Sequence, residues 1–233
     1  MGKILAIANQ KGGVGKTTTS INLGASLAGL GCKVLLVDMD PQGNCTSGVG
    51  VFMAEGQIGG YELLIGSASA EEVIVHTDVE NLDILPSRID LTAAEVELVP
   101  VENRENMLKA QLSTVKDLYD FMLIDCPPSL GLLTVNALTA ADSVLIPLQC
   151  EYYAMEGLGQ LMNTIKLIRG GLNKQLQLEG ILLTMYDQRN NLAKEVVRQI
   201  REYFPKEAFT TVVPRNVRLS EAPSHGMPIN IYD

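Results

Sequence analysis

The sequence is poor in several residue types: among 233 residues it has no tryptophan, two histidines, four cysteines and 5% aromatic residues. The histidines, His76 and His225, have no neighbouring cysteine or histidine, which argues against a zinc site. The cysteines form no CxxC pair, and no apolar run approaches the roughly 18 residues that span a bilayer. A strand-like segment follows Met1 almost directly, so we expect no signal peptide and no membrane span. These absences predict a cytoplasmic protein with reduced thiols.

The charge of the chain is acidic overall, since 18 Lys and Arg face 27 Asp and Glu, a formal net charge of −9. This excludes a wholly basic nucleic-acid-binding protein but is compatible with a local basic patch. With 46% hydrophobic and 19% charged residues, the composition is that of a globular protein and excludes a disordered chain. The sequence has no internal repeat, Pro/Ser-rich linker or block of charge. We therefore predict a single domain over residues 1–233.

Apolar runs of strand length alternate with segments of helical periodicity. Residues 3–8 and 33–38 are typical of strands buried on both faces, and a helix is predicted between them over 15–28. We expect these residues to form one βαβ unit with parallel strands and a right-handed crossover. Further strands are predicted at 82–85, 121–125, 143–147, 178–184 and 210–213, and further helices near 91–116, 130–140, 153–169 and 191–203.

This alternation predicts a doubly wound α/β fold, with a mostly parallel sheet and helices on both faces. The glycine-rich stretch 43–75 is predicted to be an excursion at the C-terminal edge of the sheet. The final segment, 220–233, contains two prolines and is predicted to be mostly loop.

The segment KGGVGKTT, residues 11–18, lies between the first predicted strand and the first predicted helix. Its glycines let backbone N–H groups turn toward phosphate oxygens, and the helix N-terminus adds the positive end of its dipole. Lys16 is placed to reach the β- and γ-phosphates of a nucleotide, and the Thr17 hydroxyl to ligate Mg²⁺. The pattern GxxxxGK[ST] expects glycine where Gln10 stands. The segment still predicts a P-loop NTPase whose phosphate-binding residues are Gly12, Gly13, Val14, Gly15, Lys16, Thr17 and Thr18.

Two aspartates follow later strands. Asp40, in the segment DMDPQGN (38–44), comes at the end of the second predicted strand, which we expect to lie beside the first, where such sheets bind ligands. The plainer alternative is that Asp40 only starts a turn. The run FMLID ends in Asp125, a Walker B pattern in which the aspartate holds Mg²⁺ through a coordinated water. The order of the three motifs strengthens each assignment.

The distinctive feature of the loop is its second lysine, Lys11. With it, the loop resembles the deviant phosphate loop of the ParA/MinD family of ATPases, and DMDPQ resembles that family's DxDPQ segment. The resemblance implies a Mg²⁺-dependent ATPase that forms a homodimer around ATP. In that dimer Lys11 would reach the partner's phosphates and Asp40 would position the attacking water. On the loop alone, a solvated Lys11 with no such role stays an alternative.

Near the end of the chain, VPRNVRLSEAPSHG (213–226) resembles the chromosomal ParA branch often called Soj. In that branch the segment matching Pro214 and Asn216 lies against adenine, and arginines matching Arg189 and Arg218 are associated with DNA binding. The resemblance implies non-specific double-stranded DNA and a ParB-type centromere-binding protein as partners, with a nucleoid-associated role in chromosome or plasmid segregation. Ordinary surface charge is the alternative interpretation of these arginines.

The chain departs from the family pattern at both ends. It has no N-terminal extension that could hold a helix-turn-helix, and it stops after Asp233, where relatives usually add a final helix, so we expect a domain without that helix. A MinD-like membrane-cycling ATPase is the main alternative, and it would need a C-terminal amphipathic helix that 220–233 does not supply. An iron–sulfur protein of this fold would need a second cysteine ligand besides Cys126. A metabolic P-loop kinase would not need Lys11.

Overall fold

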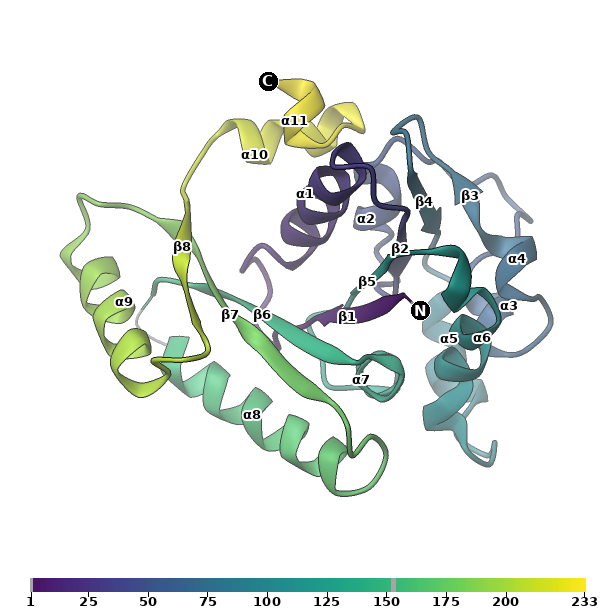
Figure 1. The fold of residues 1–233 in the computed structure, drawn as a ribbon. Coiled ribbons are helices and arrows are strands. Elements are labelled where there is room, and N and C mark those ends of the chain that lie inside the picture. Colours follow the sequence, from purple (N-terminus) through teal and green to yellow (C-terminus); the bar gives the residue numbers. More distant parts are fainter. Residues whose placement is uncertain (1, 152–153) are drawn as a thin grey trace.

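The computed structural model describes residues 2–151 and 154–233. Their strands form one sheet of eight in the order β3-β4-β2-β5-β1-β6-β7-β8 (Figure 1). Neighbouring strands are parallel except β3 and β4. The strands are β1 (Lys3–Ile7), β2 (Val34–Asp38), β3 (Val75–His76), β4 (Leu82–Leu85), β5 (Phe121–Asp125), β6 (Ser143–Gln149), β7 (Gln177–Tyr186) and β8 (Ala208–Pro214). Every predicted strand is confirmed, with ends that differ by up to two residues.

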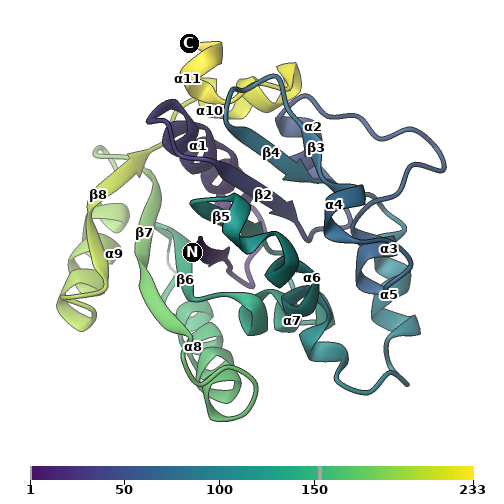
Figure 2. The ribbon, with the colours of Figure 1, turned by 45° about the vertical axis from the view of Figure 1, so that its right-hand side comes forward.

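Helices cover both faces of the sheet. They are α1 (Lys16–Gly29), α2 (Asn44–Gly48), α3 (Gly60–Leu64), α4 (Ala70–Val73), α5 (Leu91–Glu97), α6 (Met107–Val115), α7 (Leu132–Ala140), α8 (Ala154–Gly170), α9 (Asn191–Tyr203), α10 (Arg218–Glu221) and α11 (Ile229–Tyr232). One buried apolar cluster packs the helices from α3 through α9 against one face of the sheet. A second cluster packs α1 and α2 against the other face. Figures 1 and 2 show this division, with α1 and α8 on opposite sides of the sheet. The predicted α/β fold is therefore confirmed.

The three central strands, β2, β5 and β1, position the candidate site. They are continuous apolar runs buried on both faces, as parallel strands between two helical layers must be. Their register aligns Ile7 and Asp38 with Asp125, so the three strands end at one level. β1 and β2 are parallel as predicted, but the expectation that they are neighbours is wrong, because β5 lies between them. An apolar run does not encode its neighbours, and consecutive strands are adjacent in only roughly two-thirds of cases.

The helix predicted near 91–116 is divided in two. α5 ends at Glu97 and α6 begins at Met107, after a 3₁₀ turn at Arg104–Asn106. Pro100 lies in the gap, where it lacks an N–H to donate and disfavours helical backbone at the preceding residue. Asn103 then adopts the left-handed region with a φ of 58°. These two residues interrupt an otherwise helical segment.

Two segments predicted to be irregular contain short helical turns. The excursion 43–75 holds α2, α3 and α4, and the final segment holds the end of α10, a 3₁₀ turn at Ala222–His225 and α11. Helices of four or five residues are too short to show a periodic apolar face, so the pattern could not predict them. The two-residue β3 was missed for the same reason. α8 confirms the helix predicted at 153–169 from Ala154 onward, and position 153 lies outside the described residues.

The α1 face of the sheet is covered over only part of its width. α1 packs on β1, β2 and β5, and beside it an apolar groove of about 600 Å³ extends toward β8. Leu145, Leu182 and Phe209 contribute to the groove from β6, β7 and β8, and Leu23 and Leu27 contribute from α1. The helical layer on this face is therefore narrower than the sheet.

Candidate active site

The turn from β1 into α1 leaves its backbone accessible. Gly13 and Gly15 have φ angles of 73° and 88°, a conformation that residues with a Cβ rarely adopt. Apart from Gly13 and its two neighbours in the chain, no atom of the described residues lies within 4 Å of the position that a Cβ on Gly13 would take, so the space beside the loop is open. The loop is tied to β7, because Thr184 Oγ1 donates to the Val14 carbonyl at 2.8 Å. Backbone N–H groups can therefore face a ligand while the loop keeps its shape.

Lys16 is a buried cation beneath this loop. It begins α1, is 7% exposed, and donates from Nζ to the Lys11 carbonyl at 3.3 Å. Burial lowers the pKa of Lys16, while the nearby charges of Asp125 and Asp40 oppose that shift. The ammonium is thus held between the loop and two carboxylates.

Two fully buried aspartates, Asp38 and Asp125, lie at paired ends of β2 and β5. Burial raises the pKa of both carboxyls, and the charge of Asp38 raises the pKa of Asp125 further. Asp38 accepts hydrogen bonds from the N–H and hydroxyl of Thr46 and from the N–H of Asp40. Asp125 Oδ1 accepts from Ser20 Oγ at 2.9 Å, whereas Oδ2 has no partner among the described residues. Asp38 is therefore satisfied by protein groups. Asp125 keeps one oxygen without a hydrogen bond among the described residues, although the Thr17 hydroxyl is near enough to lower the pKa of this carboxyl.

Asp40 is fixed through its backbone. Its N–H donates to Asp38 Oδ1 at 3.1 Å, and its carbonyl accepts from Ser87 Oγ at 3.0 Å. Its side-chain Oδ1 accepts from the Gln42 N–H at 3.0 Å. Unlike Asp38 and Asp125, Asp40 keeps some exposure, 8%, and lines the same cleft as Lys16. Of the three aspartates, Asp40 is the one whose side chain is accessible to a ligand in the cleft.

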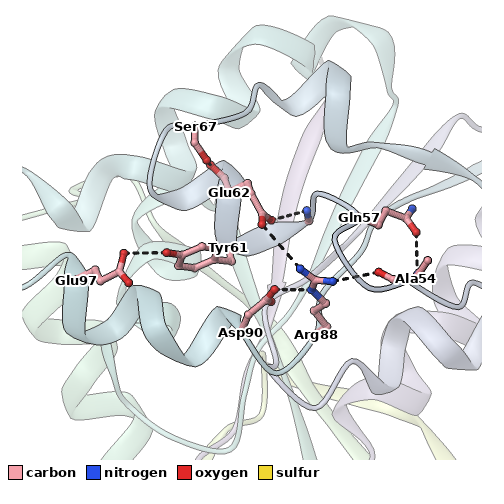
Figure 3. Close-up of polar contacts among 9 residues, drawn as sticks. Ala54, Gln57, Tyr61, Glu62, Ser67, Arg88, Asp90 and Glu97 are labelled. Carbon is pink, nitrogen blue, oxygen red and sulfur yellow. Dashed lines mark hydrogen bonds and ion pairs between the residues drawn. The ribbon is translucent and has the colours of Figure 1, made fainter.

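A polar cluster around Arg88 holds the excursion after α2 against the β4–α5 connection (Figure 3). Arg88 forms ion pairs with Asp90 and, at 3.9 Å, with Glu62 of α3. Its Nη1 donates to the Ala54 carbonyl at 3.1 Å. Ser87 immediately precedes Arg88, so this cluster lies beside the hydroxyl that supports Asp40.

The phosphate loop, Lys16 and Asp40 line one cleft of about 570 Å³. Its lining includes Gly12, Gly13, Gly15, Lys16, Thr17, Thr18, Asp40, Gln42, Asn44, Pro128, Met185 and Pro223. The structure therefore brings most of the predicted phosphate loop and Asp40 together, while Val14 is buried behind the loop. Asp125 lies close enough to Lys16 to affect its pKa. A cleft of this size lies within the range of about 300–1,000 Å³ that small-molecule sites occupy.

Pro214 and Asn216 lie in a smaller adjoining pocket of about 100 Å³, at the end of β8. This pocket shares Gly15 and Thr18 with the cleft. Met185 lines both and has a φ of 51°, an unusual backbone conformation for a residue with a side chain and a sign of local strain. The segment predicted to contact adenine is therefore adjacent to the predicted phosphate loop.

Comparison with known proteins identifies the family. Residues 2–178 match the family model described as AAA domain. The chain is 59% identical to the sporulation initiation inhibitor protein Soj of Bacillus subtilis (strain 168), over all of this chain and 92% of the relative. It is 58% identical to the chromosome-partitioning ATPase Soj of Treponema pallidum (strain Nichols), over all of this chain and 91% of the relative. The chain belongs to the ParA/MinD family.

The fold of this ParA/MinD-family chain is shared by solved structures. Two crystal structures named cobyrinic acid a,c-diamide synthase, from Mycobacterium smegmatis, have a TM-score of 0.88 and 38% identity, covering 97% of this chain and 93% of theirs. One contains ADP and magnesium, and the other contains an ATP analogue and magnesium. The predicted relation to this family of P-loop proteins is thereby confirmed.

The other lysine of this ParA/MinD loop, Lys11, forms an ion pair with Glu151. Lys11 Nζ lies 2.7 Å from Glu151 Oε2, in an ion pair whose side chains are 40% and 47% exposed. Among the described residues, the lining of the cleft does not include Lys11. Its predicted contact involves a second subunit and stays a prediction.

The two arginines predicted to bind DNA lie on separate elements. Arg189 precedes α9, is 90% exposed and pairs with Asp187 at 2.9 Å. Arg218 begins α10, is 54% exposed and pairs with Glu221 at 3.0 Å. Each positive charge therefore has a local carboxylate, and a shared role in DNA binding stays a prediction.

Sequence reasoning missed several residues that shape the site: Ser20, Asp38, Ser87, Glu151, Thr184 and Met185. Two of them carried a local signal, since Asp38 opens the DMD segment and Ser20 lies one helical turn after Lys16 on the same face of α1. The others come from strands and loops distant in sequence, where no local pattern could have indicated them.

Proposed function

We propose that this chain is a Mg²⁺-dependent ATPase that dimerises around two ATP molecules and, in that state, binds double-stranded DNA without sequence preference. Its hydrolysis is slow until a ParB-type partner, through a basic N-terminal segment, stimulates it and releases the ATPase from DNA. This cycle serves chromosome or plasmid segregation at the nucleoid. The observation that carries the proposal is the cleft that joins Lys16 and Asp40 to a glycine loop opened by Lys11. The name of the Treponema relative, a chromosome-partitioning ATPase, supports the same role.

The phosphates of ATP would be bound by the loop and the start of α1. Phosphoryl transfer depends on positioning and charge stabilisation more than on covalent chemistry. Lys16 contributes a buried cation, and the loop contributes N–H groups at the positive end of the α1 dipole. Pro214 and Asn216, in the adjoining pocket, would contact the adenine.

One observation indicates that the site can bind a divalent cation. Oδ2 of Asp125 is buried and accepts no hydrogen bond from the described residues. Buried polar atoms are nearly always satisfied, so this oxygen calls for a water or an ion. Thr17 and Asp125 would hold Mg²⁺, with a water between the cation and Asp125. Bound Mg²⁺ would neutralise charge on the β- and γ-phosphates.

Asp40 is the residue we assign to the attacking water. Its carboxylate is on the cleft, and hydrogen bonds at both its N–H and its carbonyl limit its movement. Lys11 of the second subunit would add a positive charge at the phosphates. Neither role requires a covalent intermediate.

DNA binding is assigned to Arg189 and Arg218, which would contact backbone phosphates. Contacts to phosphates carry no sequence information, so binding would be non-specific. A dimer presents two copies of each arginine to one duplex, and linked weak sites gain affinity through effective concentration. ATP would thereby control DNA binding without contacting either arginine.

The alternative of a MinD-like membrane cycle is an outcome of the same test. Among residues 2–151 and 154–233, no helix has the length and apolar character to span a bilayer. Binding to a membrane surface is a separate mode, which vesicles test directly.

Sedimentation of the purified chain with Mg²⁺ and ATP or ADP, with and without duplex DNA, tests the proposal. We expect ATP to give a dimer that binds DNA and ADP to give neither. Lys11→Ala should still bind ATP as a monomer. Lys16→Ala should not bind ATP, because the substitution removes the positive charge nearest the β- and γ-phosphates. Normal dimerisation of Lys11→Ala would contradict the proposed dimer. ATP-dependent recruitment to anionic vesicles instead of DNA would favour the membrane cycle.

A further inference from the structure

Glu151 holds the ammonium of Lys11 although 140 residues separate the two in the chain. Its Oε2 lies 2.7 Å from Lys11 Nζ, and its Oε1 accepts from Gln149 Nε2 at 2.6 Å. Gln149 ends β6, the strand that pairs with β1. Both carboxylate oxygens therefore have donors, and the carboxylate is fixed at the edge of the sheet from which the phosphate loop emerges.

The backbone of Lys11 is attached to the same strand. Its N–H donates to Asn9 Oδ1 at 3.0 Å, and Asn9 Nδ2 donates to the carbonyl of Pro147, in β6, at 2.7 Å. Asn9 is buried, with 4% exposure, so this attachment is shielded from water. Lys11 is thus held on its own subunit by its backbone and by its side chain.

We propose that Glu151 is a positioning residue that sequesters Lys11 in the free chain and releases it when the ATP dimer forms. This rests on the proposed function, in which Lys11 contacts the partner's ATP. The carboxylate and the phosphates compete for one ammonium, and like charges repel if both approach it. The triphosphate carries the larger negative charge, so the exchange is favourable when the partner has bound ATP. Glu151 thereby sets how much ATP the dimer requires.

The expected effect is modest because the pair is partly exposed. Removing one exposed ion pair changes an equilibrium constant by about 1.5- to 5-fold. A symmetric dimer breaks two such pairs, so Glu151→Gln should tighten the ATP-dependent dimer by about 2- to 25-fold. Glu151→Asp keeps the negative charge, so its dimer affinity should stay nearer to that of the unmodified chain.

A matched control comes from the ion pair of Lys3 with Glu179. Its length is also 2.7 Å, and its side chains are 43% and 32% exposed. It lies at the opposite end of β1, away from the phosphate loop. Glu179→Gln removes the same charge and the same kind of contact, so it should leave dimerisation unchanged.

The test is the dimer dissociation constant by analytical ultracentrifugation, with Mg²⁺ and a non-hydrolysable ATP analogue. Nucleotide affinity of the monomer is measured in the Lys11→Ala background with and without Glu151→Gln. We expect tighter dimers for Glu151→Gln alone and equal monomer affinities within about twofold.

The proposal would be overturned if Glu151→Gln left the dimer dissociation constant unchanged or raised it. It would also be overturned if Glu151→Asp and Glu151→Gln had the same dimer dissociation constant. A tighter dimer accompanied by an equal increase in the monomer's affinity for the nucleotide would also overturn the proposal, since the charge of Glu151 would then act on the nucleotide directly. If Lys11→Ala itself dimerises, the proposed function has failed. If Lys11→Ala stays monomeric and Glu151→Gln changes nothing, only the role of Glu151 has failed.

Discussion

Asp40 faces the cleft, whereas Asp38 and Asp125 are enclosed by the sheet. Asp40→Ala should therefore separate nucleotide binding from hydrolysis, because it removes the carboxylate assigned to water and leaves the loop, Thr17 and Asp125 in place. It also removes a negative charge near the phosphates, which favours ATP binding. We expect ATP turnover to fall by about 100-fold or more, with a long-lived dimer on DNA. Single-turnover hydrolysis and dimer lifetime measure this, and rapid turnover by the variant would exclude the role given to Asp40.

Asp125 should make the stability of the nucleotide-free chain depend on pH. Burial, reinforced by the charge of Asp38, raises the pKa of Asp125 to about 7, above the value near 4 of an unfolded chain. A carboxyl with a raised folded pKa stabilises the fold fully below the unfolded pKa, and that contribution is lost as the pH rises through the folded pKa. The affected window runs from about pH 4 to 7.

Asp125→Asn removes this titration, so its melting temperature relative to the unmodified chain should rise between pH 5 and 8. One unit of pKa corresponds to about 1.4 kcal/mol, so the relative change should be on the order of 1 kcal/mol or more. Thermal melts in nucleotide-free buffer measure it. The control is Asp117→Asn, which removes one negative charge from an exposed side chain. A pH-independent difference for Asp125→Asn would contradict the buried-charge account.

At the scale of elements, the end of α7 depends on one distant side chain. Asn173, in the α8–β7 connection, is 8% exposed, and its Nδ2 donates toward the carbonyls of Leu138, Thr139 and Ala141 at 2.7–3.2 Å. Asn173→Ala would leave buried carbonyls without a donor, which costs roughly 1–3 kcal/mol.

Urea unfolding of Asn173→Ala should show this loss, with ATP affinity unchanged because α7 ends at the edge of the sheet opposite the phosphate loop. The neighbouring Gln175→Ala is the control, since the Gln175 side chain is exposed, and surface substitutions of this kind usually stay within about 0.5 kcal/mol. Equal stability of the two variants would show that the carbonyls find other partners.

A helix or strand was predictable from the sequence where a pattern within its own residues determines its structure. Strands such as β5 are unbroken apolar runs because both faces are buried, and each is recognisable by itself. The place of β5 between β1 and β2 was not predictable, because pairing depends on packing of the whole sheet. The break between α5 and α6 is hidden by the helical periodicity of 91–116, and Pro100 is the local stop signal within that segment.

The candidate site divides in the same way. Lys16, Thr17 and Asp125 were predictable, because one loop or one strand end brings the required groups to a fixed place. The residues that hold the phosphate loop come from strands and loops far along the chain, such as Thr184, which donates to the Val14 carbonyl, and Glu151, which pairs with Lys11. Their contacts arise only from the assembled sheet, so no local pattern indicates them.

At the scale of the whole molecule, the proposed DNA binding would bring a polyanion to a small part of the surface of an acidic chain. The net charge is −9, and both candidate arginines are paired with carboxylates, Arg189 with Asp187 and Arg218 with Glu221. A DNA phosphate would therefore compete with a carboxylate at each arginine, so we expect weak binding by one monomer. In the proposed dimer, two linked copies would offset this weakness through effective concentration.

Arg189→Glu and Arg218→Glu should each abolish ATP-dependent DNA binding while dimerisation and basal hydrolysis stay nearly intact, because neither side chain lines the nucleotide cleft. For the unmodified dimer, affinity should fall steeply between about 50 and 200 mM salt, and equally on unrelated duplexes, since cations released from phosphates drive the binding. Arg104→Glu, at an exposed arginine on another part of the chain, is the matched control and should keep the same salt dependence. Fluorescence anisotropy with labelled duplexes measures each affinity. A charge-reversed variant that binds with the unmodified salt dependence would place the DNA-binding surface elsewhere on the molecule.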